Sequence, residues 1–496
     1  MTTKTTKFIA YFTLIILVCS LLPLYIISFY NHPFYDDYVF AMPVHHTWLE
    51  THNIKTTLQV ALDNVHHIRD TWQGTYTGTF FSNIQPGLFN ENYYFICSLF
   101  LITTFTLGMG FFLWVLSRQV FLLNKSNSII FSSLTLFLII HFLPDVAEAF
   151  YWFNGGVGNI FIFSILFSSI ALLIKLCKEN SILKQCFISI VLFICVLLLG
   201  GGSYGGGLFG LCIYFLFVLY AFFFTKKNRV IISLLFITFL LLFIYNMTAP
   251  GNVLRANYIK HDEDALFSIV QALYYGTALI GNYFTLTPLA LCILLLPLFT
   301  ESIEKQSYNF SHPFLIIFLM GGLFCVPLVP TLFSGVFIGA GRIQNTYFIN
   351  FYVFIICAFY YLVGFTSKRY PLFTKTINKN KTLILISASC IFLLSLTGAP
   401  AKRDELIGVQ NLAGVSATVS LLTGEAESYH NEMLLREELL NDSSKNEITL
   451  SPISQTPDVF MQDLLLPDAV HNVVPTLKNY YKKDQIIVSD LERSTQ

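Results

Sequence analysis

Long apolar runs alternate with short polar segments over residues 1–398. A helix needs about 20 apolar residues to cross the hydrocarbon core of a bilayer, and the runs approach or exceed that length. The predicted spans are residues 8–29, 93–116, 128–144, 157–175, 182–199, 207–224, 230–247, 283–299, 313–333, 343–365 and 381–398. The pattern therefore predicts an all-α integral membrane protein with about 11 transmembrane helices.

Segment 266–282 is the apolar stretch whose placement the pattern leaves open. It could be a twelfth span, or a helix that lies along the interface or re-enters the membrane. Lys and Arg in short loops favour the cytoplasmic side. With eleven spans and a cytoplasmic N-terminus, the inner segments hold Lys4, Lys7, Arg118, Lys125, Lys175, Lys178, Lys184, Lys226, Lys227, Arg229, Lys305, Lys368, Arg369, Lys375, Lys379 and Lys381. The outer loops then hold Lys55, Arg69, Arg255, Lys260 and Arg342.

A twelfth span would move the basic cluster 368–381 to the outside, so we expect eleven spans. Composition supports the same class, because 55% of the 496 residues are hydrophobic and only 12% are charged. A soluble protein of this length needs more surface charge. The expected surroundings are the lipid bilayer of the cell membrane, without a nucleic-acid partner.

The cysteines and the first apolar run add two expectations. All ten cysteines lie in or at the edge of apolar runs, so we expect no disulfide framework and no cysteine-based metal site. The run 8–29 lacks a small-x-small cleavage site, so we expect it to be retained as a span.

Two hydrophilic regions face outward in this topology. The first is the loop 30–92, which belongs with the transmembrane domain 1–398. The second is the tail 399–496, with fifteen Asp and Glu against eight Lys and Arg. Its pattern predicts a helix over 425–440 and short strands at 447–453 and 485–488, with Pro-marked turns between them. The tail is therefore predicted to be a small extracytoplasmic α/β domain.

Loop 30–92 contains an amphipathic helix and, before it, an acidic pair. Apolar residues recur at three- and four-residue spacing over 54–72, which is typical of a helix lying on a membrane surface. The stripe is Ile54, Leu58, Leu62, Val65 and Ile68, followed by Trp72.

The acidic pair is Asp36 and Asp37, flanked by Tyr35 and Tyr38 a few residues after the first span. Adjacent carboxylates near a low dielectric tend to push the pKa of one of them up, which suits a general base. The alternative is that both cap the following helix and remain solvated.

Three more outer loops carry candidate binding residues. Segment 144–156 places Asp145 and Glu148 near Trp152, without a basic residue. Segment 248–258 has a Pro-Gly turn before Asn252 and Arg255, and segment 335–347 carries Arg342. Arg suits a phosphate because its fork donates two parallel hydrogen bonds and stays charged. The alternative for each Arg is snorkelling to lipid headgroups at a helix end.

Two other motifs have simpler explanations. The Gly-rich segment 200–207 lacks the Gly-Lys-Ser/Thr ending of a nucleotide-binding loop, so a tight turn or a close helix approach explains it better. The pairs His45-His46 and His66-His67 are adjacent, and adjacent side chains do not face one another on a helix. The pair His66-His67 could still supply one residue to a divalent-metal site with Asp63 or Asp70, by analogy with other acidic outer sites, and no other cofactor is expected.

These features together resemble the GT-C glycosyltransferase superfamily. The shared features are a cytoplasmic N-terminus, an acidic pair in a large loop after the first span, surface helices, about eleven spans and an outer C-terminal domain. More closely, NHPFYDDYVFA, YWFNGG, APGNVLR and LLPDAVHNVVPTLKNYY are similar to segments of a group of bacterial multi-span proteins related to that superfamily. The similarity covers essentially the whole chain.

The resemblance implies transfer of a sugar from a polyprenyl-phosphate-linked donor to an outer acceptor, such as a surface glycan, teichoic acid, lipopolysaccharide or protein. By that analogy Asp36 or Asp37 is the general base, and Arg255 and Arg342 grip the lipid phosphate. Many members of the superfamily carry Asp-Glu where this chain has Asp-Asp, which leaves the identity of the base open.

Three alternatives remain from the sequence. A transporter or flippase would place polar residues at mid-span, whereas these spans are nearly free of charge. A polysaccharide polymerase or ligase usually has its large outer loop late in the chain. A non-catalytic relative that acts as a scaffold is the third.

Reporter fusions test the eleven-span topology. A reporter after residue 375 should report the cytoplasm and one after residue 410 the outside, because the basic cluster 368–381 favours the inner face. The reverse result would mean that segment 266–282 crosses the membrane.

Overall fold

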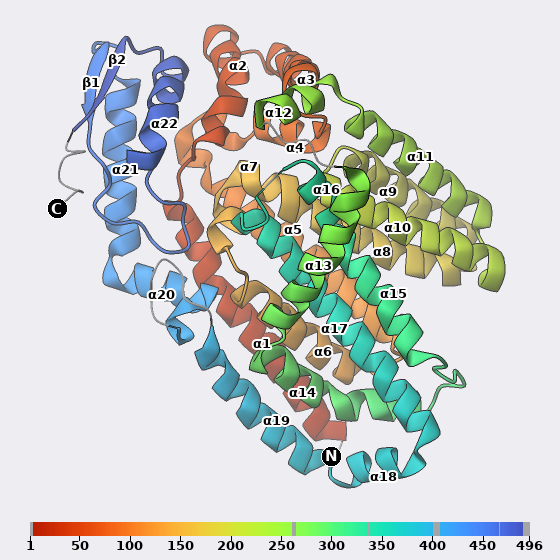
Figure 1. Ribbon diagram of the computed structural model, residues 1–496. Helices are drawn as coiled ribbons and strands as arrows, with labels where there is room; N and C mark the ends of the chain where they lie inside the picture. The colour runs from red at the N-terminus through yellow and green to blue at the C-terminus, as the bar shows by residue number, and fades with distance from the viewer. Residues whose placement is uncertain (1–2, 260–263, 336, 400–406, 466, 490–496) are drawn as a thin grey trace.

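The computed structural model describes residues 3–259, 264–335, 337–399, 407–465 and 467–489 and is built almost entirely from helices (Figure 1). Its first half contains α1 (Thr3–Ile27), α2 (Asp36–Thr51), α3 (Ile54–Thr71), α4 (Tyr76–Asn83), α5 (Phe95–Val115), α6 (Lys125–His141), α7 (Phe153–Gly156), α8 (Ile162–Lys178), α9 (Ile182–Gly200), α10 (Tyr204–Tyr220) and α11 (Arg229–Met247). Its second half contains α12 (Pro250–Ile259), α13 (Ala265–Tyr283), α14 (Leu286–Ile303), α15 (Pro313–Cys325), α16 (Leu328–Phe333), α17 (Gly341–Arg369), α18 (Pro371–Lys379), α19 (Lys381–Ser395), α20 (Ala413–Thr423), α21 (Glu425–Asn441), β1 (Glu447–Leu450), α22 (Pro467–Tyr480) and β2 (Gln485–Val488).

Ten helices of the described chain are long and apolar enough to cross a membrane, which confirms a multi-pass, mainly helical membrane protein. They coincide with ten of the eleven predicted runs. The eleventh run, 128–144, corresponds to α6, an apolar helix of 17 residues. The open segment 266–282 is helix α13, which packs on α15, α16 and α17 and is not among the ten.

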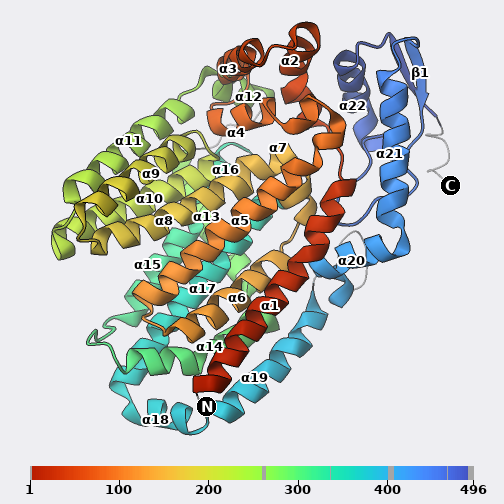
Figure 2. The same ribbon diagram turned by 180° about the vertical axis from the view of Figure 1, so that it is seen from behind.

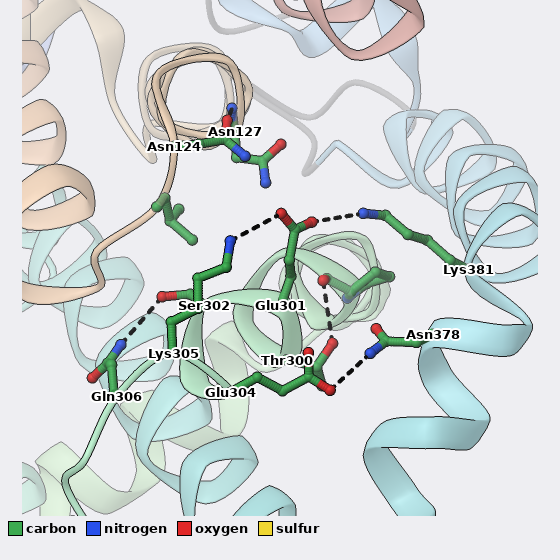
Figure 3. A network of polar contacts seen from close by, with 12 residues as sticks. Asn124, Asn127, Thr300, Glu301, Ser302, Glu304, Lys305, Gln306, Asn378 and Lys381 are labelled. Atoms are coloured by element: carbon green, nitrogen blue, oxygen red, sulfur yellow. Dashed lines mark hydrogen bonds and ion pairs between the residues drawn. The ribbon is translucent and has the colours of Figure 1, made fainter. Parts of the chain in front are cut away.

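A network of charged and polar side chains ties α14, α18 and α19 together at one end of the bundle (Figure 3). The Glu301 carboxylate lies 2.9 Å from Lys381 Nζ and 3.6 Å from Lys305 Nζ. Asn378 Nδ2 donates to Glu304 Oε1 at 3.0 Å. The N-terminus lies at this same end (Figures 1 and 2). We call it the basic end, because most Lys and Arg of the predicted inner loops belong to the segments that meet here.

Further contacts join two more predicted inner loops to this network. Lys368 Nζ donates to the Gln306 carbonyl, and the Gln306 amide donates to the Phe121 carbonyl at 3.3 Å. Lys178 Nζ donates to the carbonyl of Gln119 in the same loop as Phe121. Segments far apart in sequence but alike in charge therefore meet at one end of the molecule.

The opposite end carries α2, α3, α4, α12 and the C-terminal elements (Figures 1 and 2). Helix α3 confirms the predicted amphipathic helix. Asn53 caps its start, because the Asn53 side chain accepts hydrogen bonds from Lys55 N and Thr56 N. Thr57 and Ala61 face the protein and are buried. The first part of the apolar stripe faces away from it, with Ile54 55%, Leu58 40% and Leu62 48% exposed. Val65 and Ile68, further along the stripe, are half-buried. The exposed part of the stripe is available to a membrane surface.

The C-terminal elements match the predicted helix and both predicted strands. Helix α21 precedes β1, and β1 pairs in parallel with β2, Glu447 opposite Gln485. These elements share one apolar core with α2: Tyr38, Ala41, Val44, Leu440, Ile448, Leu477, Tyr480 and Ile486 are buried together. Because that core extends into α2, the boundary at residue 398 stays a prediction.

A buried ion pair holds the C-terminal elements together. Arg436 Nη1 and Nη2 donate to the two Asp463 carboxylate oxygens at 2.7 and 3.1 Å, and both side chains are almost completely buried. We expect Asp463→Ala to destabilise the protein by about 3–5 kcal/mol, because it leaves an uncompensated buried cation. Thermal unfolding in detergent measures this loss.

The matched control is Glu50→Ala, which breaks the exposed Lys482–Glu50 pair between the C-terminal elements and α2. It should change stability by about 0–1 kcal/mol. Equal losses of stability in Asp463→Ala and Glu50→Ala would contradict the conclusion that the buried Arg436–Asp463 pair holds the C-terminal elements together.

Candidate active-site cavity

A cavity of about 660 Å³ lies among α2, α3, α10, α12, α16 and α17, at the end opposite the basic end. This is the size of a site for a small-molecule ligand. Four of the predicted residues line it: Asp36, Trp152, Arg255 and Arg342. They come from four segments that are far apart in the sequence, and the fold brings them together.

Asp36 presents its carboxylate to the cavity from the first turn of α2. Asn154 Nδ2 donates to Asp36 Oδ2 at 3.2 Å. Burial raises the pKa of Asp36, and Arg342 and Arg255 oppose that rise through their positive charge. A carboxylate with a raised pKa, still reachable from a cavity, is suited to accept a proton.

Asp37 has a different environment. Its side chain is completely buried and does not line the cavity. The carboxylate accepts hydrogen bonds from Phe34 N at 2.9 Å, Tyr94 Oη at 2.6 Å and Asn154 N at 2.9 Å. The alternative of a helix cap left in solvent does not describe Asp37, which instead joins three segments of the chain.

Asn154 lies between the two carboxylates and was not among the predicted site residues. Its backbone N–H binds Asp37, and its side-chain amide binds Asp36. Ser82 Oγ donates to Asn154 Oδ1 at 2.7 Å, which directs the NH₂ group toward Asp36. The motif YWFNGG contained this signal, but an Asn in a loop has too many uses for its role to be read from sequence.

Arg342 is paired with a carboxylate. Its Nη1 and its backbone N donate to Glu148 Oε2 at 2.9 and 3.0 Å, and its guanidinium lies 5.1 Å from the centre of the Trp152 ring. Asp145 Oδ1 accepts the backbone N–H of Glu148 at 2.8 Å. Glu148 and Asp145 were predicted to bind the substrate directly, but they do not line the cavity. Their role in the structure is to position Arg342.

Arg255 carries the less compensated charge. Its guanidinium lies 5.2 Å from the centre of the Trp72 ring, and Nη1 donates to Gln73 Oε1 at 2.8 Å. Within the described ranges no carboxylate forms an ion pair with it. Burial lowers its pKa, and the nearby Arg342 adds to this effect. A half-buried guanidinium that faces a cavity and has no carboxylate partner among the described residues is a good partner for an anionic ligand.

Asn252, predicted to bind substrate, supports the backbone around Arg255. Its Oδ1 accepts Gly74 N at 3.1 Å and the Tyr204 hydroxyl, and its Nδ2 donates to the carbonyls of Asn246 and Met247 at 3.0 Å. It does not line the cavity. Asn252 therefore fixes the end of α11 and the turn before α4.

Aromatic rings and glycines form much of the rest of the lining, together with aliphatic and small polar side chains. Tyr35, Trp72, Tyr204 and Tyr347 contribute rings, and the Gly-rich segment contributes residues 202–206. Over the described residues, no three His, Cys, Asp or Glu side chains come together in a way that could hold a metal ion. The arrangement therefore offers one proton acceptor, two guanidinium groups and aromatic walls, a combination that suits an anionic ligand carrying an apolar or carbohydrate group.

Asp37 should make stability depend on pH. Burial raises the pKa of its carboxyl from 3.8 to about 7. The stability that the protonated carboxyl contributes is complete below about pH 4 and is lost as the pH rises through about 7. We expect the unfolding temperature in detergent to fall over this interval by the equivalent of a few kcal/mol, on the order expected for such a shift.

Asp37→Asn should remove most of this pH dependence. Asp63→Asn, at an exposed position of α3, should leave it unchanged. If the unfolding temperature of Asp37→Asn still fell with pH as in the wild type, Asp37 would not be the source of the pH dependence.

The comparisons with known proteins give no family for this chain. It matches no family model, no curated protein and no solved structure.

Proposed function

We propose that the protein is a membrane glycosyltransferase that moves a sugar from a polyprenyl-phosphate-linked donor to a hydroxyl of an extracytoplasmic acceptor. The acceptor would be a cell-surface glycan, teichoic acid, lipopolysaccharide or protein. One observation carries the proposal: the accessible carboxylate of Asp36 and the guanidinium of Arg255 face the same cavity at one end of a membrane bundle. A base and an anion-binding group in one cavity are what this transfer needs.

Asp36 would take the proton of the acceptor hydroxyl. The hydroxyl oxygen would form a bond to the anomeric carbon while the bond from that carbon to the phosphate oxygen breaks. The lipid phosphate would leave with one additional negative charge, and Arg255 would stabilise it there. A single displacement of this kind inverts the anomeric configuration.

Arg342 would act mainly on Asp36. Its ion pair with Glu148 offsets part of its charge, and its remaining field favours the ionised form of Asp36. The indole of Trp152 beneath Arg342 would form an apolar wall for the sugar.

The basic end supports the predicted orientation. Lys and Arg gather there, so the positive-inside rule favours the cytoplasm for that end and for the N-terminus. The cavity, α3 and the tail 399–496 would then lie on the outer side of the cell membrane. The exposed apolar stripe of α3 would rest on the bilayer surface beside the cavity.

The alternatives are a transporter or flippase, a polysaccharide polymerase or ligase, and a scaffold. A transporter site lies near the bilayer midplane, whereas this cavity lies among the helices of one end of the bundle. A polymerase or ligase would use similar groups, and the donor distinguishes it. A scaffold would not need a carboxylate and two arginines that line one cavity.

Substitution of the two central residues tests the proposal. The protein would be reconstituted in vesicles with a labelled polyprenyl-phosphate sugar and membranes of a deletion strain as acceptor. We expect Asp36→Asn to insert normally and to lower kcat on the order of 10²–10⁴-fold, because it removes the base. Arg255→Gln should lower kcat/KM on the order of 10²-fold or more.

Arg69→Gln is the matched control for Arg255. Arg69 also lies over an aromatic ring, that of Tyr245, at the same end of the bundle but outside the cavity lining. It should leave transfer unchanged. Wild-type transfer by Asp36→Asn and by the double variant Asp36→Asn/Asp37→Asn would exclude the catalytic role.

A further inference from the structure

Part of the cavity wall has no side chains. Six glycines line it: Gly78, Gly155, Gly158, Gly202, Gly205 and Gly206. At Gly155 a methyl group would lie 2.5 Å from the Trp152 ring, and at Gly205 it would lie 2.8 Å from the Pro327 carbonyl. Those two glycines are needed for packing. At Gly158 a methyl group would meet nothing within 4 Å, so bare backbone faces open space there.

Two buried polar groups of this wall have no partner among the described residues, the Ser203 hydroxyl and the indole N–H of Trp152. Of these two, the Trp152 indole is the one that can only donate. Its side chain lies against Gly155, and the residue is only 6% exposed. Within the described part of the chain its Nε1–H donates to no acceptor. A buried donor without an acceptor costs about 1–3 kcal/mol, which a ligand hydroxyl would recover.

Each charged group of the cavity already has an ion-pair partner or a role in the proposed reaction. Among the described lining residues they are Asp36, Arg255 and Arg342. Arg342 is paired with Glu148, and in the proposed reaction Arg255 serves the phosphate. A second anion on the sugar would find no cation of its own and would lie near Asp36. An ammonium group on the sugar would lie near the two guanidinium groups.

We infer that the transferred sugar is uncharged and that it lies against the Gly158 wall, where a sugar hydroxyl accepts the Trp152 Nε1–H bond. This inference rests on the proposed function and names its substrate class, a neutral hexose or N-acetylhexosamine. The open space at Gly158 sets how large that sugar can be.

A donor series tests the charge. The wild-type protein would receive the same polyprenyl phosphate carrying a hexose, an N-acetylhexosamine or a hexuronic acid, with membranes of a deletion strain as acceptor. We expect kcat/KM for the uronic acid to be at least on the order of 100-fold lower than for the better neutral donor, because its carboxylate would be buried without a partner. Equal or faster transfer of the uronic acid would overturn the inference and leave the proposed function standing. Absence of transfer from all three donors would count against glycosyl transfer itself.

Substitutions test the wall. Gly158→Leu should raise KM for the neutral donor on the order of tenfold or more by filling the open space. Trp152→Phe keeps a ring but removes the N–H, and should raise KM on the order of five- to tenfold, as expected for one hydrogen bond. The control is Gly322→Leu on α15, where a methyl group also meets nothing within 4 Å but the cavity is not lined.

The control should keep the wild-type KM and unfolding temperature. If Gly158→Leu does not fold, Trp152→Phe alone decides. Wild-type KM in Trp152→Phe and in any folded Gly158→Leu would overturn the placement of the sugar at this wall.

Discussion

The buried Asp37 carboxylate organises the cavity end of the molecule. Its three hydrogen bonds come from the segment that leaves α1, from the start of α5 and from α7. These segments are distant in sequence, and hydrogen bonds to one buried carboxylate are favourable only if all donors are in place together. With Asp37 fixed, the first turn of α2 is fixed, and Asp36 is held at the cavity.

The second constraint is close backbone contact around Arg255. A methyl group at Gly74 would lie 2.0 Å from the Asn246 carbonyl, and one at Gly251 would lie 2.3 Å from Trp72 N. These glycines therefore let α12 and the end of α11 reach the backbone that follows α3. Arg255 then lies over the Trp72 ring. Each charged group of the cavity thus has its own structural support, so the site does not depend on a single loop.

Sequence patterns predicted the features that depend on periodicity and charge. Apolar run length found the spans, and three- and four-residue spacing found α3, because both report directly on what a helix exposes. The elements α21, β1 and β2 followed from the same reasoning.

Patterns could not separate Asp36 from Asp37, because neighbours on a helix point to different sides and only packing decides which side is buried. The same limit applies to Asn252 and Asp145, whose side chains bind backbone atoms, and to Asn154, whose importance lies in geometry.

The shared core of α2 and the C-terminal elements has a consequence for biosynthesis. Tyr38 in α2 packs against the ring of Tyr480, and β1 cannot pair until residues 485–488 exist. The helix that carries Asp36 is synthesised hundreds of residues before the C-terminal elements that cover part of its apolar face. Helix α2 can therefore reach its final packing only after the C-terminal elements of the described chain have been synthesised.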